Sequence, residues 1–254
     1  MKGEFRGLPK IPTRLPAIGK TVSTLTGLLV FFSTTASGQV VLDDFSTDKR
    51  SNYDYVPVFG DPSDGWAVSD GALHPSIDGI ASATWLWNKG ETLSATGDSV
   101  SISLSLPTGL NNGFPNSIGL FVAADTSLTG GHFVSQTTFN GVWGYSVDGD
   151  TTQAGAAPTG PVQLTIQRTG QTVDGFVYTV TFSGGGLPSP IVNSFAEPSD
   201  TLLFGPYAEN TAGTPAALDN FTFTAVPEPS MYAAVFGLLA LTTAVIRTRN
   251  AKRS

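Results

Sequence analysis

The chain has 254 residues and no cysteine. Without thiols, the protein cannot form disulfides, use a thiolate nucleophile or ligate a metal through sulfur. Its stability must come from an apolar core, which a chain of this length is large enough to build. Export from the cell permits disulfides but does not require them in a domain of this size. The lack of cysteine therefore excludes thiol chemistry, but it is compatible with export from the cell.

Basic residues are scarce in the central part of the chain. Of the 13 Lys and Arg residues, nine lie before residue 40 or after residue 246, which leaves 13 − 9 = 4 in between. Those four are Lys49, Arg50, Lys89 and Arg168. They stand against 18 of the 20 carboxylates, so the central part has a net charge of 4 − 18 = −14. Such a surface repels phosphate backbones, which excludes nucleic acid as a partner, and it attracts cations such as Ca²⁺.

Catalytic motifs are also lacking. The only histidines are His74 and His132, and no G-x-S-x-G sequence accompanies them. Both are predicted to be loop or surface residues. Glycoside hydrolysis needs two carboxylates on either side of the scissile bond. Glu91, Glu197 and Glu209 each stand alone in the sequence, so we expect no enzyme, with a glycan-cleaving jelly-roll enzyme as the alternative.

The N-terminal segment has the layout of a secretory signal peptide. Residues 1–20 carry five positive charges, residues 22–32 are mostly apolar, and small residues continue to Gly38. Residues 1–38 are therefore predicted to be removed by cleavage between Gly38 and Gln39, with the secretion translocon and signal peptidase as partners. The alternative is an uncleaved anchor. The apolar run is about a dozen residues, shorter than the roughly 20 that span a bilayer.

The C-terminal segment, residues 226–254, has three parts in a fixed order. Residues 226–230 contain Pro227, Glu228 and Pro229, residues 231–246 are apolar, and residues 247–254 are basic. The apolar part is near the lower limit of length for a transmembrane helix. Basic residues that follow such a helix stay in the cytoplasm, which would place the central part of the chain outside the membrane.

This arrangement resembles the PEP-CTERM sorting signal, in which a Pro-Glu-Pro motif, a hydrophobic helix and an Arg-rich tail end the chain. The resemblance implies transient anchoring in the inner membrane of a Gram-negative bacterium and recognition by an exosortase, which cleaves near the motif. It also implies an exopolysaccharide or biofilm setting, with the mature protein secreted or held at the cell surface. The alternative is a membrane-anchored adhesin that keeps residues 231–254.

Alternating apolar and polar residues between positions 39 and 225 predict half-buried strands. The clearest are residues 99–106, 162–168 and 176–182. Further strands are expected at 39–45, 66–73, 80–87, 117–123, 132–139, 142–147, 191–195, 201–205 and 217–224. No sustained helical stripe interrupts them. Short strands separated by turn residues predict one all-β domain at 39–225, an antiparallel β-sandwich of the jelly-roll type.

The central domain also resembles concanavalin-like and carbohydrate-binding-module jelly rolls, through residues 42–45, 65–73 and 217–223. In those families the first and last strands pair. The resemblance therefore implies a structural calcium site formed by Asp43, Asp44, Asp219 and Asn220. A second oxygen-rich segment, Asp148-Gly149-Asp150, is instead predicted to be a β-hairpin turn.

Four aromatic residues are candidates for sugar binding, because flat aromatic faces stack on sugar rings. Trp85 and Trp87 are two residues apart and so share a strand face, and Trp143 and Tyr145 repeat this spacing. Either these side chains form an exposed platform or they fill the core, with Leu86 then exposed. We expect a non-enzymatic cell-surface or extracellular-matrix protein that binds polysaccharide or acts as a structural component of the biofilm matrix.

Overall fold

The computed structural model describes residues 38–107, 114–139, 141–153, 157–226 and 235–243. The predicted signal peptide up to residue 37, the Pro227-Glu228-Pro229 motif and the basic tail lie outside this description. Of the predicted helix at 231–246, residues 235–243 are described, and they are helical. No helix within the described ranges combines the length and apolar character needed to cross a membrane.

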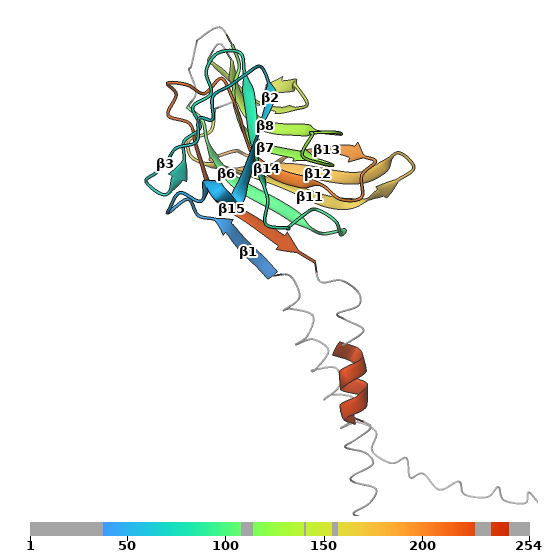
Figure 1. Ribbon diagram of the computed structural model, residues 1–254. Helices are drawn as coiled ribbons and strands as arrows, with labels where there is room; N and C mark the ends of the chain where they lie inside the picture. Colours follow the sequence, from blue (N-terminus) through green and yellow to red (C-terminus); the bar gives the residue numbers. More distant parts are fainter. Residues whose placement is uncertain (1–37, 108–113, 140, 154–156, 227–234, 244–254) are drawn as a thin grey trace, which may run out of the picture. The chain divides into compact units, whose positions relative to one another are not determined.

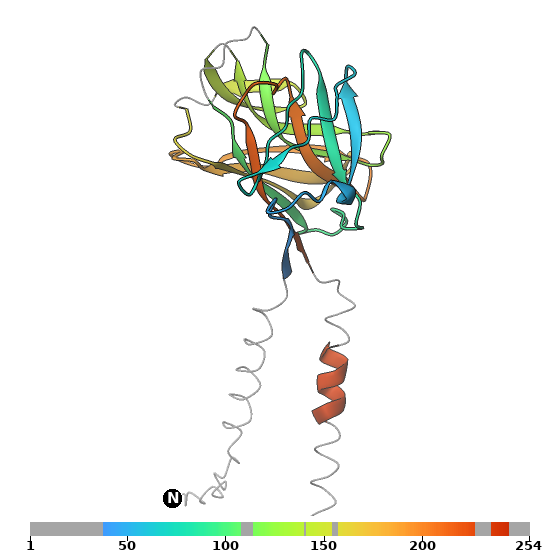
Figure 2. The same cartoon turned by 60° about the vertical axis from the view of Figure 1, so that its left-hand side comes forward.

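The central domain consists of two antiparallel sheets that face each other as layers (Figures 1 and 2). The eight-stranded sheet contains β1 (Gly38–Asp43), β3 (Val68–Ser69), β4 (Ala72–Leu73), β6 (Ser99–Ser105), β11 (Val162–Thr172), β12 (Gly175–Gly184), β13 (Ile191–Glu197) and β15 (Ala217–Ala225). The seven-stranded sheet contains β2 (Tyr53–Phe59), β5 (Ser82–Trp87), β7 (Asn116–Ala123), β8 (His132–Phe139), β9 (Val142–Val147), β10 (Asp150–Gln153) and β14 (Leu203–Glu209). One short 3-10 helix, Arg50–Asn52, precedes β2.

The chain crosses between the sheets several times. Strand β6 belongs to one sheet and β7 to the other, and β14 and β15 are likewise divided. β14 lies between β7 and β5, and β15 lies beside β6, so strands from distant parts of the chain are neighbours. The all-β sandwich predicted from the alternation is confirmed.

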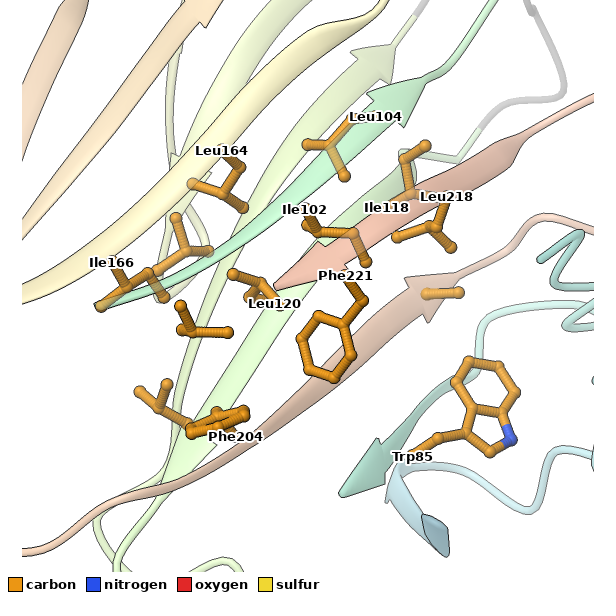
Figure 3. Packing of buried hydrophobic residues seen from close by; sticks show 14 of the residues in the cluster. Trp85, Ile102, Leu104, Ile118, Leu120, Leu164, Ile166, Phe204, Leu218 and Phe221 are labelled. Carbon is orange, nitrogen blue, oxygen red and sulfur yellow. The ribbon is translucent and has the colours of Figure 1, made fainter. Parts of the chain in front are cut away.

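The core lies between the two sheets. In β6 the half-buried serines alternate with buried Val100, Ile102 and Leu104, as the pattern predicted. Figure 3 shows how residues from both layers meet there, among them Ile102, Leu104, Ile118, Leu120, Leu164, Ile166, Phe204, Leu218 and Phe221. Every buried hydrophobic residue of the described chain lies between Leu42 and Phe223. Residues 38–226 therefore contain the whole of this core and are a suitable unit for experiments.

The single strand expected at 66–73 is a hairpin of β3 and β4, and two further strands were not predicted. Strand β2 contains Pro57; it is an edge strand, where a missing backbone N–H is tolerated. Strand β10 follows the Asp148-Gly149 turn and pairs with β9, with Val147 opposite Asp150. Both turn residues have positive φ, 54° and 85°, as a tight hairpin turn requires. The predicted hairpin turn is confirmed.

The first and last strands pair, as the family resemblance implied. β1 lies antiparallel to β15, with Gly38 opposite Ala225 and Val41 opposite Thr222. The end of β15 is held by the Asp98 carboxylate, which accepts a hydrogen bond of 2.9 Å from the Val226 N–H. The described domain therefore begins and ends at the same place on one sheet. The predicted cleavage position lies at the start of β1, and the Pro-Glu-Pro motif follows shortly after the end of β15.

Candidate functional site

The structure corrects the proposed platform of Trp85 and Trp87. These residues are 0% and 7% exposed and belong to the main core. Leu86 is not exposed either, because it packs with Phe121 and Tyr207 in a second apolar cluster on the opposite face of the seven-stranded sheet. We call this opposite face the outer face. Strand β5 is thus covered on both sides, which the two-residue spacing could not reveal.

Three of the four tryptophans have a carboxylate partner. Their indole N–H groups donate to acidic residues of neighbouring loops: Trp66 to Asp48 at 3.1 Å, Trp85 to Asp64 at 3.0 Å and Trp87 to Glu91 at 2.6 Å. Trp143 differs. It is 2% exposed, and its Nε1 is buried without a hydrogen-bond partner. Since buried polar groups are nearly always paired, this one requires an explanation.

Two further unpaired polar groups lie beside Trp143. Thr138 stands directly opposite Trp143 in the β8–β9 pair, and Gln136 precedes Thr138 by two residues, on the same face of β8. Thr138 is 0% and Gln136 is 2% exposed. The Thr138 Oγ1 and the Gln136 Oε1 have no hydrogen-bond partner, and the Gln136 Nε2 reaches only the Leu106 carbonyl, at 3.5 Å. We call Gln136, Thr138 and Trp143 the Trp143 cluster.

The Trp143 cluster is uncharged and combines complementary hydrogen-bonding groups. The indole N–H donates, the amide oxygen accepts, and the threonine hydroxyl does both. Each group left unpaired costs about 1–3 kcal/mol of folding free energy. A hydroxyl group, which also donates and accepts, has the chemistry to pair with each of these groups. Tyr145, the other residue predicted in this region, is half-buried and packs against Phe182 of the core, with ring centroids 5.6 Å apart.

A carboxyl group lies on the outer face at the same end of the sheet. Glu209 of β14 stands opposite Ser82 of β5 and Ser117 of β7. The Tyr207 hydroxyl donates to Glu209 Oε2 over 3.4 Å, and the Ser117 hydroxyl contacts that of Thr137 at 3.1 Å. Burial raises the pKa of Glu209, and hydrogen bonds from Ser117 and Tyr207, which lower it, do not fully compensate. Sequence reasoning missed this group because its neighbours include residues from two other strands, β5 and β7.

On the described strands of the outer face, Glu209 has no second carboxylate at the spacing that hydrolysis needs. Asp54 is another acidic residue on this face, and it stands opposite Leu86, four residues along β5 from Ser82. Two strand spacings and four residues separate it from Glu209 by about 16 Å. Paired carboxylates of glycoside hydrolases lie roughly 5–10 Å apart.

His132 joins the two sheets. At the start of β8, its Nδ1 lies 2.7 Å from Asp148 Oδ2 and its Nε2 lies 3.2 Å from Glu197 Oε2 of β13. The ring also stacks on Phe195, 4.2 Å between centroids. Burial opposes the charged imidazolium, but the two carboxylates outweigh it, and the pKa of His132 is raised. His132 was predicted to be a loop or surface residue; it is half-buried at the first position of β8, and its two carboxylate partners come from residues distant in the sequence.

Two of the predicted calcium ligands, Asp43 and Asp44, already form ion pairs and hydrogen bonds with other residues of the protein. Lys49 Nζ lies 3.3 Å from Asp43 and 3.2 Å from Asp44, and the Tyr53 hydroxyl donates to Asp43 over 3.0 Å. Hydrogen bonds from Ser46, together with Lys49, lower the pKa of Asp44 to about 2.

At the other predicted pair of calcium ligands, Asp219 accepts hydrogen bonds from the backbone and side chain of Asn220. Asp43 stands opposite Phe221 rather than Asp219. Within the described ranges, no three histidine or carboxylate residues are grouped as metal ligands would be. Calcium binding stays a prediction.

Comparisons with known proteins give only distant similarities. No family model matches the sequence, and no curated protein matches it. Among solved structures, the chain is similar to the winged bean acidic lectin complexed with methyl-α-D-galactose, at 10% identity over 75% of this chain and 98% of the lectin, with a TM-score of 0.49.

A lectin from Bauhinia forficata in complex with GalNAc is 8% identical over 74% of this chain and 97% of that one, with a TM-score of 0.47. An alginate lyase variant in complex with alginate trisaccharide is 10% identical over 76% and 99%, with a TM-score of 0.44. These similarities assign no family.

Proposed function

We propose that this protein is an exported, non-enzymatic polysaccharide-binding protein of the cell surface or extracellular matrix, and that the Trp143 cluster holds a hydroxyl group of a neutral sugar. The observation that carries the proposal is that three buried polar atoms without partners belong to residues that neighbour one another on one face of β8 and β9. Unpaired groups of this kind destabilise a fold. Hydrogen bonds from a bound hydroxyl group would pair them and so favour binding of the ligand.

The chemistry of the cluster favours a neutral ligand. Gln136, Thr138 and Trp143 are uncharged, and the central domain has only four basic residues against 18 acidic ones. An anionic polysaccharide would be repelled by this charge, whereas a neutral one is indifferent to it. Glutamine, threonine and tryptophan supply the hydrogen bonds and the apolar surface that sugar recognition needs.

Export and sorting rest on the terminal segments. The basic, apolar and small residues of the N-terminus support secretion, and the C-terminal segment resembles a sorting signal read by an exosortase. Pairing of β1 with β15 supports the same proposal, because both terminal segments leave the domain at one place and can be trimmed without disturbing the core. Mass spectrometry of the mature protein tests this: cleavage near Pro227 is expected for the wild type, and a retained C-terminus for Glu228→Ala.

The binding site is tested with residues 38–226 and the substitution Thr138→Val. Valine has the shape of threonine without the hydroxyl. Because Thr138 Oγ1 makes no hydrogen bond, its removal should leave stability unchanged or raise it by up to about 1 kcal/mol. Calorimetric titration with neutral gluco-, galacto- and manno-oligosaccharides should show binding to the wild type and at least about tenfold weaker binding to the variant.

Thr84→Val is the matched control. Thr84 is equally buried, but it lies on the outer face of the same sheet, and its hydroxyl donates to the Pro206 carbonyl over 2.9 Å. This variant should lose about 1–2 kcal/mol of stability and keep the wild-type affinity. If Thr138→Val is as stable as the wild type and binds the same oligosaccharides equally well, the Trp143 cluster is a hydrated structural feature and the proposed site is wrong.

A further inference from the structure

The C-terminal end of the central domain is attached to a turn that is distant in the sequence. Val226 follows directly after β15, and its backbone N–H donates to Asp98 Oδ1 over 2.9 Å, across a separation of 128 residues. The Val226 side chain lies against Gly97, where a Cβ would be only 2.5 Å from Val226 Cγ2. The backbone and the side chain of Val226 are therefore both fixed to the turn at residues 94–98.

Asp98 is itself firmly positioned. It is 3% exposed, and its other carboxylate oxygen, Oδ2, accepts from the backbone N–H groups of Ser94 at 3.0 Å and Ala95 at 2.7 Å. The turn is also joined to β11, because the Arg168 N–H donates to the Asp98 carbonyl over 3.0 Å and the Gly97 N–H donates to the Arg168 carbonyl over 2.7 Å. Hydrogen bonds to a charged carboxylate are stronger than those between neutral groups, so this arrangement holds Val226 securely.

The N–H group that Asp98 holds belongs to the peptide bond between Ala225 and Val226. Proteases cut segments that are exposed or that open locally, so this bond is open to attack only after Val226 has left Asp98. Ala225 is also the residue that stands opposite Gly38 in β1. Among the described strands, β1 pairs with β15 alone. Loss of the end of β15 would therefore remove part of the only strand partner of β1.

We propose that Asp98 is a stop for processing: it shields the Ala225–Val226 bond, so that an enzyme trimming the C-terminal segment cuts only beyond Val226. The proposal rests on the proposed function in one respect, namely that this segment is trimmed. Asp98 directly precedes β6, and it meets Val226 because β6 and β15 are paired. The stop therefore exists only in the folded domain, where it keeps β15 complete during trimming.

The test follows elastase digestion of residues 38–230 by mass spectrometry. Elastase cuts after small apolar residues, so the Ala225–Val226 bond is a suitable target. Val173 is 100% exposed in the turn between β11 and β12, and cleavage after it provides an internal reference. In the wild type, the Ala225–Val226 bond should be cut at least about tenfold more slowly than the bond after Val173.

The substitution Asp98→Asn should weaken the stop. Asparagine has one acceptor oxygen where aspartate has two, and its NH₂ group would face backbone N–H groups, so it cannot keep both sets of hydrogen bonds. Cleavage of the Ala225–Val226 bond, relative to cleavage after Val173, should rise at least about tenfold. Asp125→Asn is the matched control. Asp125 likewise accepts hydrogen bonds from backbone N–H groups, in the turn between β7 and β8, and its substitution should leave the ratio unchanged.

Equal ratios in the wild type and Asp98→Asn contradict the proposal. Hydrogen exchange of the Val226 amide adds a measurement that needs no variant: the amide should be protected, and exchange as fast as that of the exposed Val173 amide contradicts the stop. A mature chain from the bacterium that ends before Val226 does so as well. A mature chain that keeps residues 231–254 contradicts the proposed sorting instead, and the elastase result stands independently of it.

Discussion

The contact between His132 and its two carboxylates makes a testable prediction about stability. Substituting His132→Gln removes the positive charge that lies between Asp148 and Glu197. The Glu197 side chain is only 11% exposed, so its carboxylate would lose its charged partner in a poorly hydrated site. The variant should therefore unfold more easily than the wild type, through its effect on the link between β8 and β13.

The size of the effect follows from the burial of the two partners. Removing one member of a buried ion pair costs about 3–5 kcal/mol, and an exposed pair is worth about 0–1 kcal/mol. Glu197 is close to the first case, and Asp148, with a side chain that is 40% exposed, is close to the second. Because Gln can keep one of the two hydrogen bonds, we expect a loss of about 2–4 kcal/mol, which lowers the melting temperature by roughly 5–12 °C.

The pH dependence distinguishes a charged contact from simple packing. The pKa of His132 is raised in the folded protein, so its contribution is complete below the ordinary value of 6.5 and is lost as the pH rises through the folded-state value. Thermal unfolding of wild type and His132→Gln should therefore differ most near pH 5.5 and converge at alkaline pH. A constant difference at every pH would refute this reasoning, as would full additivity of His132→Gln and Glu197→Gln in a double-mutant cycle.

Two further predictions concern other parts of the domain. Gly205→Ala should lower the free energy of unfolding by about 3 kcal/mol or more, because a Cβ there would lie 2.0 Å from the Trp85 carbonyl oxygen. Gly170→Ala is the control, since its Cβ meets no atom within 4 Å. Equal melting temperatures of the two variants would contradict the packing described. Glu209→Gln should stabilise the domain at neutral pH but not below about pH 4.5, because a raised pKa means that ionisation of Glu209 opposes folding. A difference in stability that does not change with pH would show that burial does not raise the pKa of Glu209.

Local patterns in the sequence predicted much of the fold. The serine alternation in β6 predicted which residues face the core, and the Asp148-Gly149 pair predicted its turn, because both depend on neighbours along the chain. Strand β2 was missed because Pro57 is allowed only at an edge, and edges are defined by the whole sheet. Trp85 and Trp87 could not be assigned, since a two-residue spacing shows that side chains share a face but not what covers it.

The candidate site could be recognised almost entirely from the tertiary structure alone. Trp143 was selected from its spacing, but its significance comes from Thr138 opposite it and from the absence of the acidic partner that each other tryptophan has. Glu209 is isolated in the sequence and acquires its environment from residues on β5 and β7. Such pairings over long sequence distances are set by strand order and register, which no local pattern encodes.

The most direct test of the central claim is the indole N–H resonance of Trp143 in a ¹⁵N-labelled sample of residues 38–226. The other three indole groups donate to Asp48, Asp64 and Glu91, so only that of Trp143 is free to accept a new partner. Titration with neutral oligosaccharides should shift the Trp143 resonance in a saturable way and leave the other three in place, and Thr138→Val should abolish the shift. If an oligosaccharide binds while the Trp143 resonance stays unmoved, sugar is recognised elsewhere and the account of this site is wrong.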